Sequence, residues 1–209
     1  MKAQDCDESV VIVNGWLHDE ASFAEVFNHY RKRLRQMVVV RLDRRLCGRI
    51  DVDDVLQESF LEAFRGLTAY KDRCTTLPVF LWLRLIVGEK LLDLHRHHLG
   101  VQKRSAGREV SLQHGPVPAA SSVAIADHLM GSFTSPSHAA VRAETRQEIQ
   151  DALNQMDALD REILVLRNFE LLSNAEAAQE LGISQQASSN RYIRALRRMK
   201  TVLERTREP

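Results

Sequence analysis

The sequence predicts an all-α protein of two small helical domains joined by a flexible linker. Apolar residues recur at helical spacing from residue 21 to 99 and again from 141 to 209. Residues 100–140 break that pattern with four of the nine glycines, three of the five prolines and many serines, a composition typical of a tether between domains. No segment alternates apolar and polar residues as a half-buried strand does. Residues 1–20 precede the first helical stripe and are predicted to be an N-terminal tail.

The composition limits the function classes. The net charge of +1 means that any nucleic-acid surface must arise from local segregation of charge. The three cysteines, Cys6, Cys47 and Cys74, show no C-x-x-C spacing, and their odd number favours a reducing cytoplasm over a disulfide framework. The acidic N-terminus lacks the basic start of a signal peptide. Residues 77–94, the most apolar window, contain four charged residues, so no stable membrane insertion is expected.

The N-terminal domain is predicted to hold three helices. The second helix follows Asp51 and is expected to end at Gly66. A turn-like stretch over residues 68–76 leads to Pro78, from which the third helix runs to about His97. The first helix carries an apolar stripe made of Phe23, Val26, Phe27, Tyr30, Leu34, Met37 and Val38.

The C-terminal domain is predicted to begin with a helix that carries Ile149 and Leu153, followed by a second helix with Asp160 as its cap. A short helix around residues 121–129 fits the pattern weakly within the linker. The sharpest signal follows, where Ser173 and Glu176 have the spacing of a capping box that starts a helix.

That capping box opens a predicted helix-turn-helix. Ala178 is small where a second helix must approach closely, and Gly182 suits the left-handed residue at a helix end. Ile183 fits the turn and Ser184 can cap the next helix. From Gly182 to Lys200 the chain has five basic residues and no acid. Amides and hydroxyls near the start of this helix suit base edges and arginines suit phosphates, whereas an ordinary solvated basic face is the plainer alternative.

Two other segments carry concentrated polar groups. Three carboxylates open the second helix, and their interaction with the helix dipole explains them on structural grounds alone. Gln57, Glu58 and Glu62 extend the polar face beyond what the dipole explains. A catalytic carboxylate pair is disfavoured because no nucleophile, metal-ligand cluster or glycine-rich loop accompanies it, so neither catalysis nor a cofactor is expected. His95 and His98 share a helix face, but a phosphate-facing patch with Arg96 is preferred to a metal site.

The two helical blocks resemble the extracytoplasmic-function (ECF) sigma factors of the bacterial sigma-70 family. Asp51-x-x-Asp54-Val-x-Gln57-Glu58 is similar to region 2.2, and Trp82-Leu83, Ile86, Asp93 and Arg96 are similar to regions 2.3 and 2.4. Region 4 is matched by Leu159-Asp160-x-Glu162, Glu176-Ala-Ala178, Leu181-Gly182-Ile183-Ser184, Arg191, Ala195 and Arg198.

The resemblance implies a transcription initiation factor without catalysis of its own. Its partners would be core RNA polymerase, promoter DNA and an anti-sigma factor or other regulator. The implied polymerase-binding residues are Asp51, Asp53, Asp54, Gln57 and Glu58. Those implied for the minus-ten element are Tyr70, Lys71, Arg73, Thr75, Trp82, Arg84, Lys90 and Arg96. Those implied for the minus-thirty-five element are Ser184, Gln185, Gln186, Ser188, Ser189, Asn190, Arg191, Arg194, Arg197 and Arg198.

Three positions depart from the family pattern. Glu89 replaces a usual asparagine, Ser188 replaces a buried valine or isoleucine, and Ser189 replaces a frequent lysine.

Two rival interpretations stay open: a stand-alone helix-turn-helix regulator, which would require a dimer interface, and a helical adaptor whose basic helix only aids solubility. Cys74 lies in the segment implied to capture a base, where an incidental thiol is favoured over a redox role.

Overall fold

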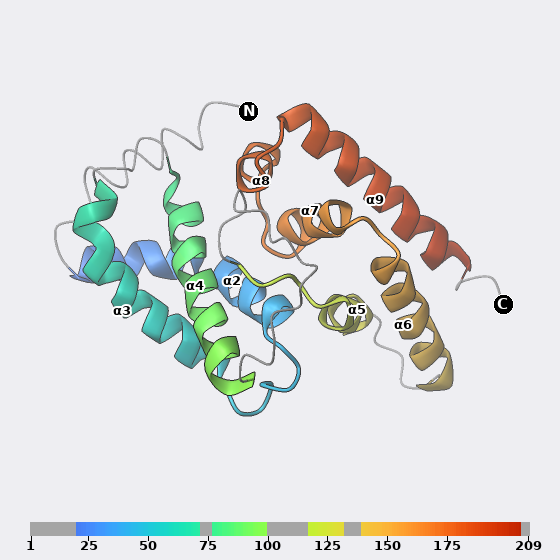
Figure 1. Ribbon diagram of the computed structural model, residues 1–209, viewed down its shortest axis with the longest axis horizontal. Helices are drawn as coiled ribbons and strands as arrows, with labels where there is room; N and C mark the ends of the chain where they lie inside the picture. The colour runs from blue at the N-terminus through green and yellow to red at the C-terminus, as the bar shows by residue number, and fades with distance from the viewer. Residues whose placement is uncertain (1–19, 72–76, 100–116, 132–138, 206–209) are drawn as a thin grey trace. The chain divides into compact units, whose positions relative to one another are not determined.

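The computed structural model describes residues 20–71, 77–99, 117–131 and 139–205. Within these ranges the chain forms eight α-helices and no strand, which confirms the all-α prediction (Figure 1). The chain divides into two compact units. Unit 1 comprises Met1–Val39 and Arg45–Pro118, and unit 2 comprises Val40–Arg44 and Ala119–Pro209.

Unit 1 is built from three helices, as predicted: α2 (Glu20–Arg41), α3 (Val52–Lys71) and α4 (Val79–Leu99). Aromatic rings join α2 to α3, since the Phe60 ring centroid lies 5.2 Å from that of Phe23 and 5.3 Å from that of Phe27. Ring pairs at this spacing stabilise a core beyond the area that they bury. The helices enclose a largely aliphatic core that includes Leu34, Met37, Val38, Leu56, Leu83, Val87 and Leu91.

Helix α3 runs through Gly66, so the prediction that this glycine ends the helix is wrong. A Cβ at this position would meet only Trp82, at an ordinary contact distance of 3.8 Å. Gly66 therefore adopts a helical backbone beside an aromatic ring of α4, and the helix continues to Lys71. The last part of the predicted turn, residues 72–76, lies outside the described residues.

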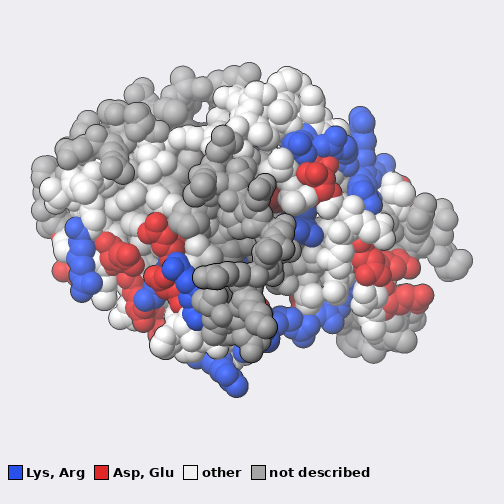
Figure 2. Space-filling model, in the orientation of Figure 1, with Lys and Arg blue, Asp and Glu red and all other residues white. Residues whose placement is uncertain are grey.

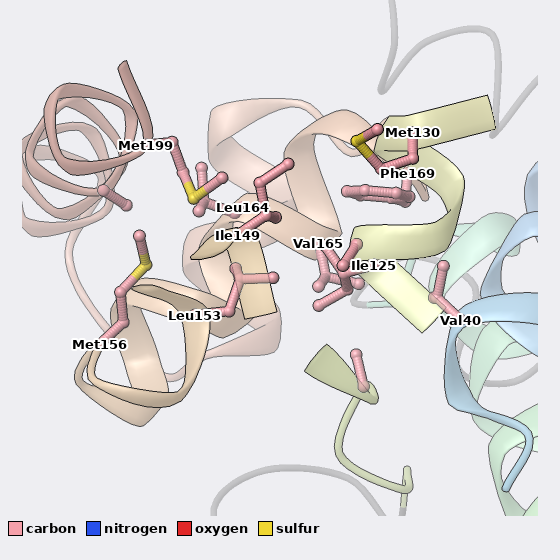
Figure 3. Packing of buried hydrophobic residues seen from close by; sticks show 13 residues of the cluster. Val40, Ile125, Met130, Ile149, Leu153, Met156, Leu164, Val165, Phe169 and Met199 are labelled. Carbon is pink, nitrogen blue, oxygen red and sulfur yellow. The ribbon is translucent and has the colours of Figure 1, made fainter. Parts of the chain in front are cut away.

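Unit 2 contains α5 (Ser122–Gly131), α6 (Ala139–Asn154), α7 (Ala158–Asn168), α8 (Asn174–Glu180) and α9 (Gln185–Arg205). Apolar side chains from α5, α6, α7 and α9 meet in one buried cluster (Figure 3). Its fully or nearly fully buried members include Ile125, Ile149, Leu153, Leu164, Val165 and Phe169. Arg41, in the short segment that unit 2 takes from the end of α2, is buried and paired with Glu162 and Glu170.

The predicted linker over residues 100–140 contains one described helix, α5. Helix α5 lies where the sequence only weakly indicated a helix, and its Ile125, Ala126 and Met130 belong to the buried cluster of unit 2. Burial of this apolar face, rather than local propensity, holds so short a helix in place. Residues 100–116 and 132–138 lie outside the described ranges.

Candidate nucleic-acid and partner-binding surfaces

The helix-turn-helix of unit 2 begins with the predicted capping box. The Ser173 hydroxyl accepts a hydrogen bond from the Glu176 amide at 3.2 Å, and the Glu176 carboxylate accepts one from the Ser173 amide at 2.7 Å. Each contact satisfies an amide that a helix start would otherwise leave unpaired. The start of α8 is therefore fixed by its own local sequence.

The turn between α8 and α9 also follows the prediction. Gly182 adopts a left-handed backbone with φ of 62°, which costs glycine little because it lacks a Cβ. Ala177 and Ala178 are buried where α8 meets α9. The Ser184 hydroxyl accepts a hydrogen bond from the Ala187 amide at 3.1 Å and so acts as the N-cap of α9.

The first turns of α9 present amides to solvent. Gln185, Gln186 and Asn190 are exposed, and the Gln186 amide group donates to the Asn190 side-chain oxygen at 3.2 Å. Ser189 is half-buried. Ser188 is fully buried. Its side chain packs inside unit 2 and does not face a ligand, which corrects its predicted DNA contact.

Asp160 does not cap α7, which corrects the prediction. The N-cap is Asp157, whose carboxylate accepts from the Leu159 amide at 2.9 Å. Asp160 instead receives hydrogen bonds from two α9 arginines: Arg194 through Nε and Nη2 at 2.6 and 2.8 Å, and Arg191 through Nη1 at 2.7 Å. These four residues, Asp157, Asp160, Arg191 and Arg194, are called the Asp160 cluster below.

The charge of the Asp160 cluster is set by competing effects. Burial alone would raise the pKa of Asp160, but the hydrogen bonds from Arg194 and Arg191 outweigh it and hold that pKa below its ordinary value. Asp160 is therefore ionised near neutral pH. No local pattern of residues indicates this arrangement, because the arginines lie 31 and 34 residues further along the chain than Asp160.

The remaining basic residues of α9 lie further from its start. Arg197, Arg198 and Lys200 are exposed, and Arg198 donates to the side chain of Gln155, the residue that follows α6, at 3.3 Å. Figure 2 shows basic side chains gathered over the α9 region with acidic ones beside them. The exposed amides of α9 and its cationic residues are the chemical groups that hydrogen-bond bases and neutralise phosphates.

Unit 1 has an open groove between α2 and α3 with a volume of about 290 Å³. Small-molecule sites are enclosed and typically ~300–1,000 Å³, so this shallow, open feature suits a protein surface better. It is called the α2–α3 groove. The residues that line it are Ala24, Phe27, Asn28, Arg31, Asp53, Asp54, Leu56, Gln57 and Phe60.

Three predicted polymerase-binding residues, Asp53, Asp54 and Gln57, meet at the α2–α3 groove. Asn28 and Arg31 of α2 also line the groove, although neither was predicted to bind polymerase. Their spacing from Ala24 could have indicated that they share a helix face beside the apolar stripe. An exposed ion pair of 2.9 Å joins Arg31 to Asp53 across the two helices.

The other two predicted polymerase-binding residues lie outside the lining of this groove. Asp51 precedes α3, and its carboxylate accepts from the Asp53 amide at 2.8 Å, the local role expected of an acid at a helix start. Glu58 forms an ion pair with Lys90 of α4. The sequence assigned Glu58 to polymerase and Lys90 to DNA, whereas the structure brings the two side chains together.

Tyr70 and Trp82 form a buried stack at the junction of α3 and α4. Their ring centroids are 4.1 Å apart with an interplanar angle of 11°, and the Tyr70 hydroxyl donates to the Leu77 carbonyl at 2.7 Å. Tyr70 is only 3% exposed. Both residues were predicted to contact DNA, but the structure stacks them in the interior of unit 1, where Tyr70 also holds the Leu77 carbonyl.

The remaining residues predicted for the minus-ten element divide into three groups. Arg84 is 1% exposed, so its guanidinium packs within unit 1 and does not reach the surface, which corrects its predicted DNA contact. Arg96 is exposed and pairs with Asp93 at 2.9 Å. Arg73, Thr75 and the side chain of Lys71 lie outside what the structure describes, and so does Cys74, for which an incidental thiol was favoured.

Glu89, the residue that replaces the family's usual asparagine, faces other acids. Desolvation first, and then the carboxylates of Glu62 and Asp93, raise the pKa of Glu89 above its ordinary value.

In the described part of the chain no group of three metal-ligating side chains gathers. Within the same residues, no helix is long and apolar enough to span a bilayer.

Comparison with known proteins places these surfaces in context. Residues 146–199 match the family model described as sigma-70, region 4. The chain is 30% identical over 192 residues to the ECF RNA polymerase sigma factor SigD of Mycobacterium tuberculosis, an alignment that covers 87% of this chain and 82% of SigD. It is 27% identical over 159 residues to the RNA polymerase sigma factor NccH of Alcaligenes xylosoxydans xylosoxydans, covering 74% of each.

The fold is similar to that of CnrH, solved in complex with the cytosolic domain of CnrY. The TM-score is 0.51 and the sequence identity 22%, with 96% of this chain and 97% of that chain covered. At this identity the likeness concerns the fold alone, and it agrees with the all-helical architecture.

Proposed function

This chain belongs to the ECF family of RNA polymerase sigma factors, and from that membership we propose how its two units select a promoter. It is a transcription initiation factor that directs RNA polymerase to promoters, and it is not an enzyme. In the proposal, unit 1 binds core polymerase and the minus-ten element, and unit 2 binds the minus-thirty-five element. Each unit alone binds DNA weakly, and linkage raises the effective concentration of the second contact.

The observation that carries the proposal is that the helix-turn-helix is fully formed and that the start of its second helix, α9, is exposed. In this motif the second helix enters the major groove by its N-terminal end. Gln185, Gln186 and Asn190 are exposed there, and glutamine and asparagine side chains can pair with the adenine edge through two hydrogen bonds. Arginines further along the helix then supply contacts to the phosphates.

For the polymerase contact we propose the α2–α3 groove. Its rim carries Asp53 and Asp54 beside Arg31, and its floor carries Phe27, Leu56 and Phe60. A charged rim around an apolar floor is the arrangement typical of protein interfaces. Asp54 is exposed at this rim, which makes it the residue of choice for a test.

For the minus-ten element we propose that residues 71–77 and Arg96 contact the opened strand, next to the stack of Tyr70 and Trp82 that joins the end of α3 to the start of α4. Extruding a base from the duplex costs a few kcal/mol, so contacts to the unstacked base can select sequence. Tyr70 holds the start of this segment to its end through the hydrogen bond to Leu77. The buried Arg84 has no place in this proposal.

Run-off transcription with core polymerase tests the division of labour. Asp54→Ala is expected to weaken core binding about tenfold, and its control is Glu25→Ala, an exposed acid of α2 that does not line the groove. Gln186→Ala is expected to keep core binding but to lose preference for the minus-thirty-five sequence, and its control is Thr201→Ala near the other end of α9. Discrimination against a wrong base is worth ~1–3 kcal/mol per bidentate contact, so the preference should fall about tenfold. Equal core binding by Asp54→Ala and Glu25→Ala would refute the assignment of the groove.

We also propose that a separate protein regulates this factor by covering one of its units. The support is that the structural neighbour CnrH was solved in complex with the cytosolic domain of CnrY. Co-expression of a candidate regulator should lower transcription from a promoter that depends on this factor. Asp54→Ala and Gln186→Ala, assayed for binding to that regulator, would then show which unit is covered.

A further inference from the structure

The Asp160 cluster fixes the pose of two arginines on α9. The Asp160 side chain is only 9% exposed, and it accepts three hydrogen bonds, two of them from a single guanidinium. A bidentate arginine–carboxylate pair is specific in geometry as well as strong. Arg191 adds a second contact, at 3.1 Å, to Asp157. The carboxylate on α7 therefore determines where the two guanidinium groups of α9 point.

The arginines nevertheless stay accessible. The Arg194 side chain is 63% exposed and that of Arg191 is 27% exposed. A guanidinium has five N–H donors, and Asp160 uses only Nε and Nη2 of Arg194. The rest of the group can donate to an incoming phosphate without leaving Asp160.

We propose that Asp160 is a positioning residue for promoter recognition, which holds Arg191 and Arg194 in the pose that meets the DNA backbone beside the minus-thirty-five element. This inference rests on the proposed function of α9. A free arginine loses rotamer freedom when it binds, whereas these two lose that freedom when unit 2 folds. Fixed phosphate contacts also set the register in which α9 meets the bases, so the effect falls on sequence preference.

The alternative role for Asp160, simple neutralisation of the two arginines, makes a different prediction. If Asp160 merely neutralised two cations, its removal would add net positive charge to the surface. Affinity would then rise alike for every DNA sequence, because phosphate neutralisation is independent of sequence. The ratio of affinities for a selected promoter and for the same promoter with a scrambled minus-thirty-five element separates the two readings.

The experiment uses holoenzyme assembled from core polymerase and the full chain. The DNA is a promoter selected from a random library by wild-type holoenzyme, together with a copy whose minus-thirty-five element is scrambled. Asp160→Asn, which keeps the shape and removes the charge, is expected to lower the affinity ratio about tenfold while affinity for the scrambled copy stays the same or rises. Asp160→Glu should restore part of the ratio. Asp127→Asn, which removes a carboxylate paired with Arg146 in the same unit, should leave it unchanged.

A second variant guards against simple misfolding. Arg194→Lys keeps the positive charge at an exposed site but cannot form the fork to Asp160, and the ratio should again fall several-fold. Hydrogen exchange should show that α7–α9 remain folded in both variants, with amides still protected although less so than in the wild type. A folded Asp160→Asn or Arg194→Lys chain whose ratio is unchanged or raised overturns the inference. If wild-type holoenzyme itself shows no preference for the minus-thirty-five element, then the proposed function fails instead.

Discussion

The Ser188 side chain places a hydroxyl group inside unit 2 without a hydrogen-bond partner among the described residues. A buried hydroxyl without a partner destabilises the fold, because it loses its hydrogen bonds to water and gains none within the protein. The family's usual apolar residue at this position avoids that cost.

Ser188→Ala is therefore expected to stabilise unit 2 by about 1 kcal/mol, through loss of the orphan hydroxyl and gain in helix propensity. Urea denaturation followed by hydrogen exchange in α9 measures the change. Ser189→Ala is the matched control, since its half-buried side chain should give only the smaller propensity gain, about 0.5 kcal/mol. Equal gains from both variants would mean that the Ser188 hydroxyl is satisfied in solution.

The Asp160 cluster predicts a pH dependence of stability. Because the pKa of Asp160 is lowered in the folded chain, its ionised form stabilises the fold above the unfolded pKa, and this contribution is lost as pH falls through the folded pKa. Asp160→Asn should therefore lower the free energy of unfolding near neutral pH by about 1–3 kcal/mol, the range for hydrogen bonds to charged groups. The gap between variant and wild type should shrink below the ordinary pKa of 3.8. Urea midpoints across that range test this, and a constant gap contradicts it.

At the residue scale, local roles were predictable and distant ones were not. Ser173, Glu176 and Ser184 have hydrogen-bond partners three residues away, so spacing alone indicated their roles. Asp160 was misassigned because its partners lie on another helix. Arg84 was misassigned because an arginine among apolar residues gives no sign of whether it is buried.

Helices α3 and α9 offer a paired test at the scale of the element, because one glycine lies within α3 and another lies in the turn that precedes α9. Gly182 has a positive φ of 62°, whereas Gly66 lies within a regular helix and has room for a Cβ. Gly182→Ala should destabilise unit 2 by about 1 kcal/mol, the cost of a left-handed backbone with a Cβ. Gly66→Ala should stabilise unit 1 by about 0.8–1.0 kcal/mol from helix propensity.

Hydrogen exchange resolved by peptide reports the two glycine variants separately, in α8–α9 for Gly182→Ala and in α3 for Gly66→Ala. The expected signs are opposite. Destabilisation by both would show that the Trp82 ring cannot accept a methyl group at Gly66. Stabilisation by both would contradict the left-handed turn at Gly182.

Helix α5 shows why some elements are only weakly indicated by the sequence. It has ten residues, below the length at which an isolated helix is stable in water. It also lies between stretches rich in glycine, proline and serine that mask its apolar face. The contacts that Ile125, Ala126 and Met130 make in unit 2 stabilise it, and these contacts cannot be read from residues 122–131 alone.

At the scale of the whole molecule, the prediction of a linker over residues 100–140 can be tested by changing its length. Inserting about ten glycine and serine residues between residues 106 and 107 should weaken promoter binding only about twofold, since effective concentration falls as roughly the −3/2 power of linker length. The same residues added after Pro209 are the control and should have no effect. A loss of more than about tenfold would mean that residues 100–116 do more than connect.

The stack of Tyr70 on Trp82 has a consequence for how such a factor can change. Because the Tyr70 hydroxyl joins the end of α3 to a backbone carbonyl, that of Leu77, the contact requires no particular side chain at position 77. Descendants of this factor could therefore exchange that side chain while an inherited frame keeps α3 joined to the chain just before α4.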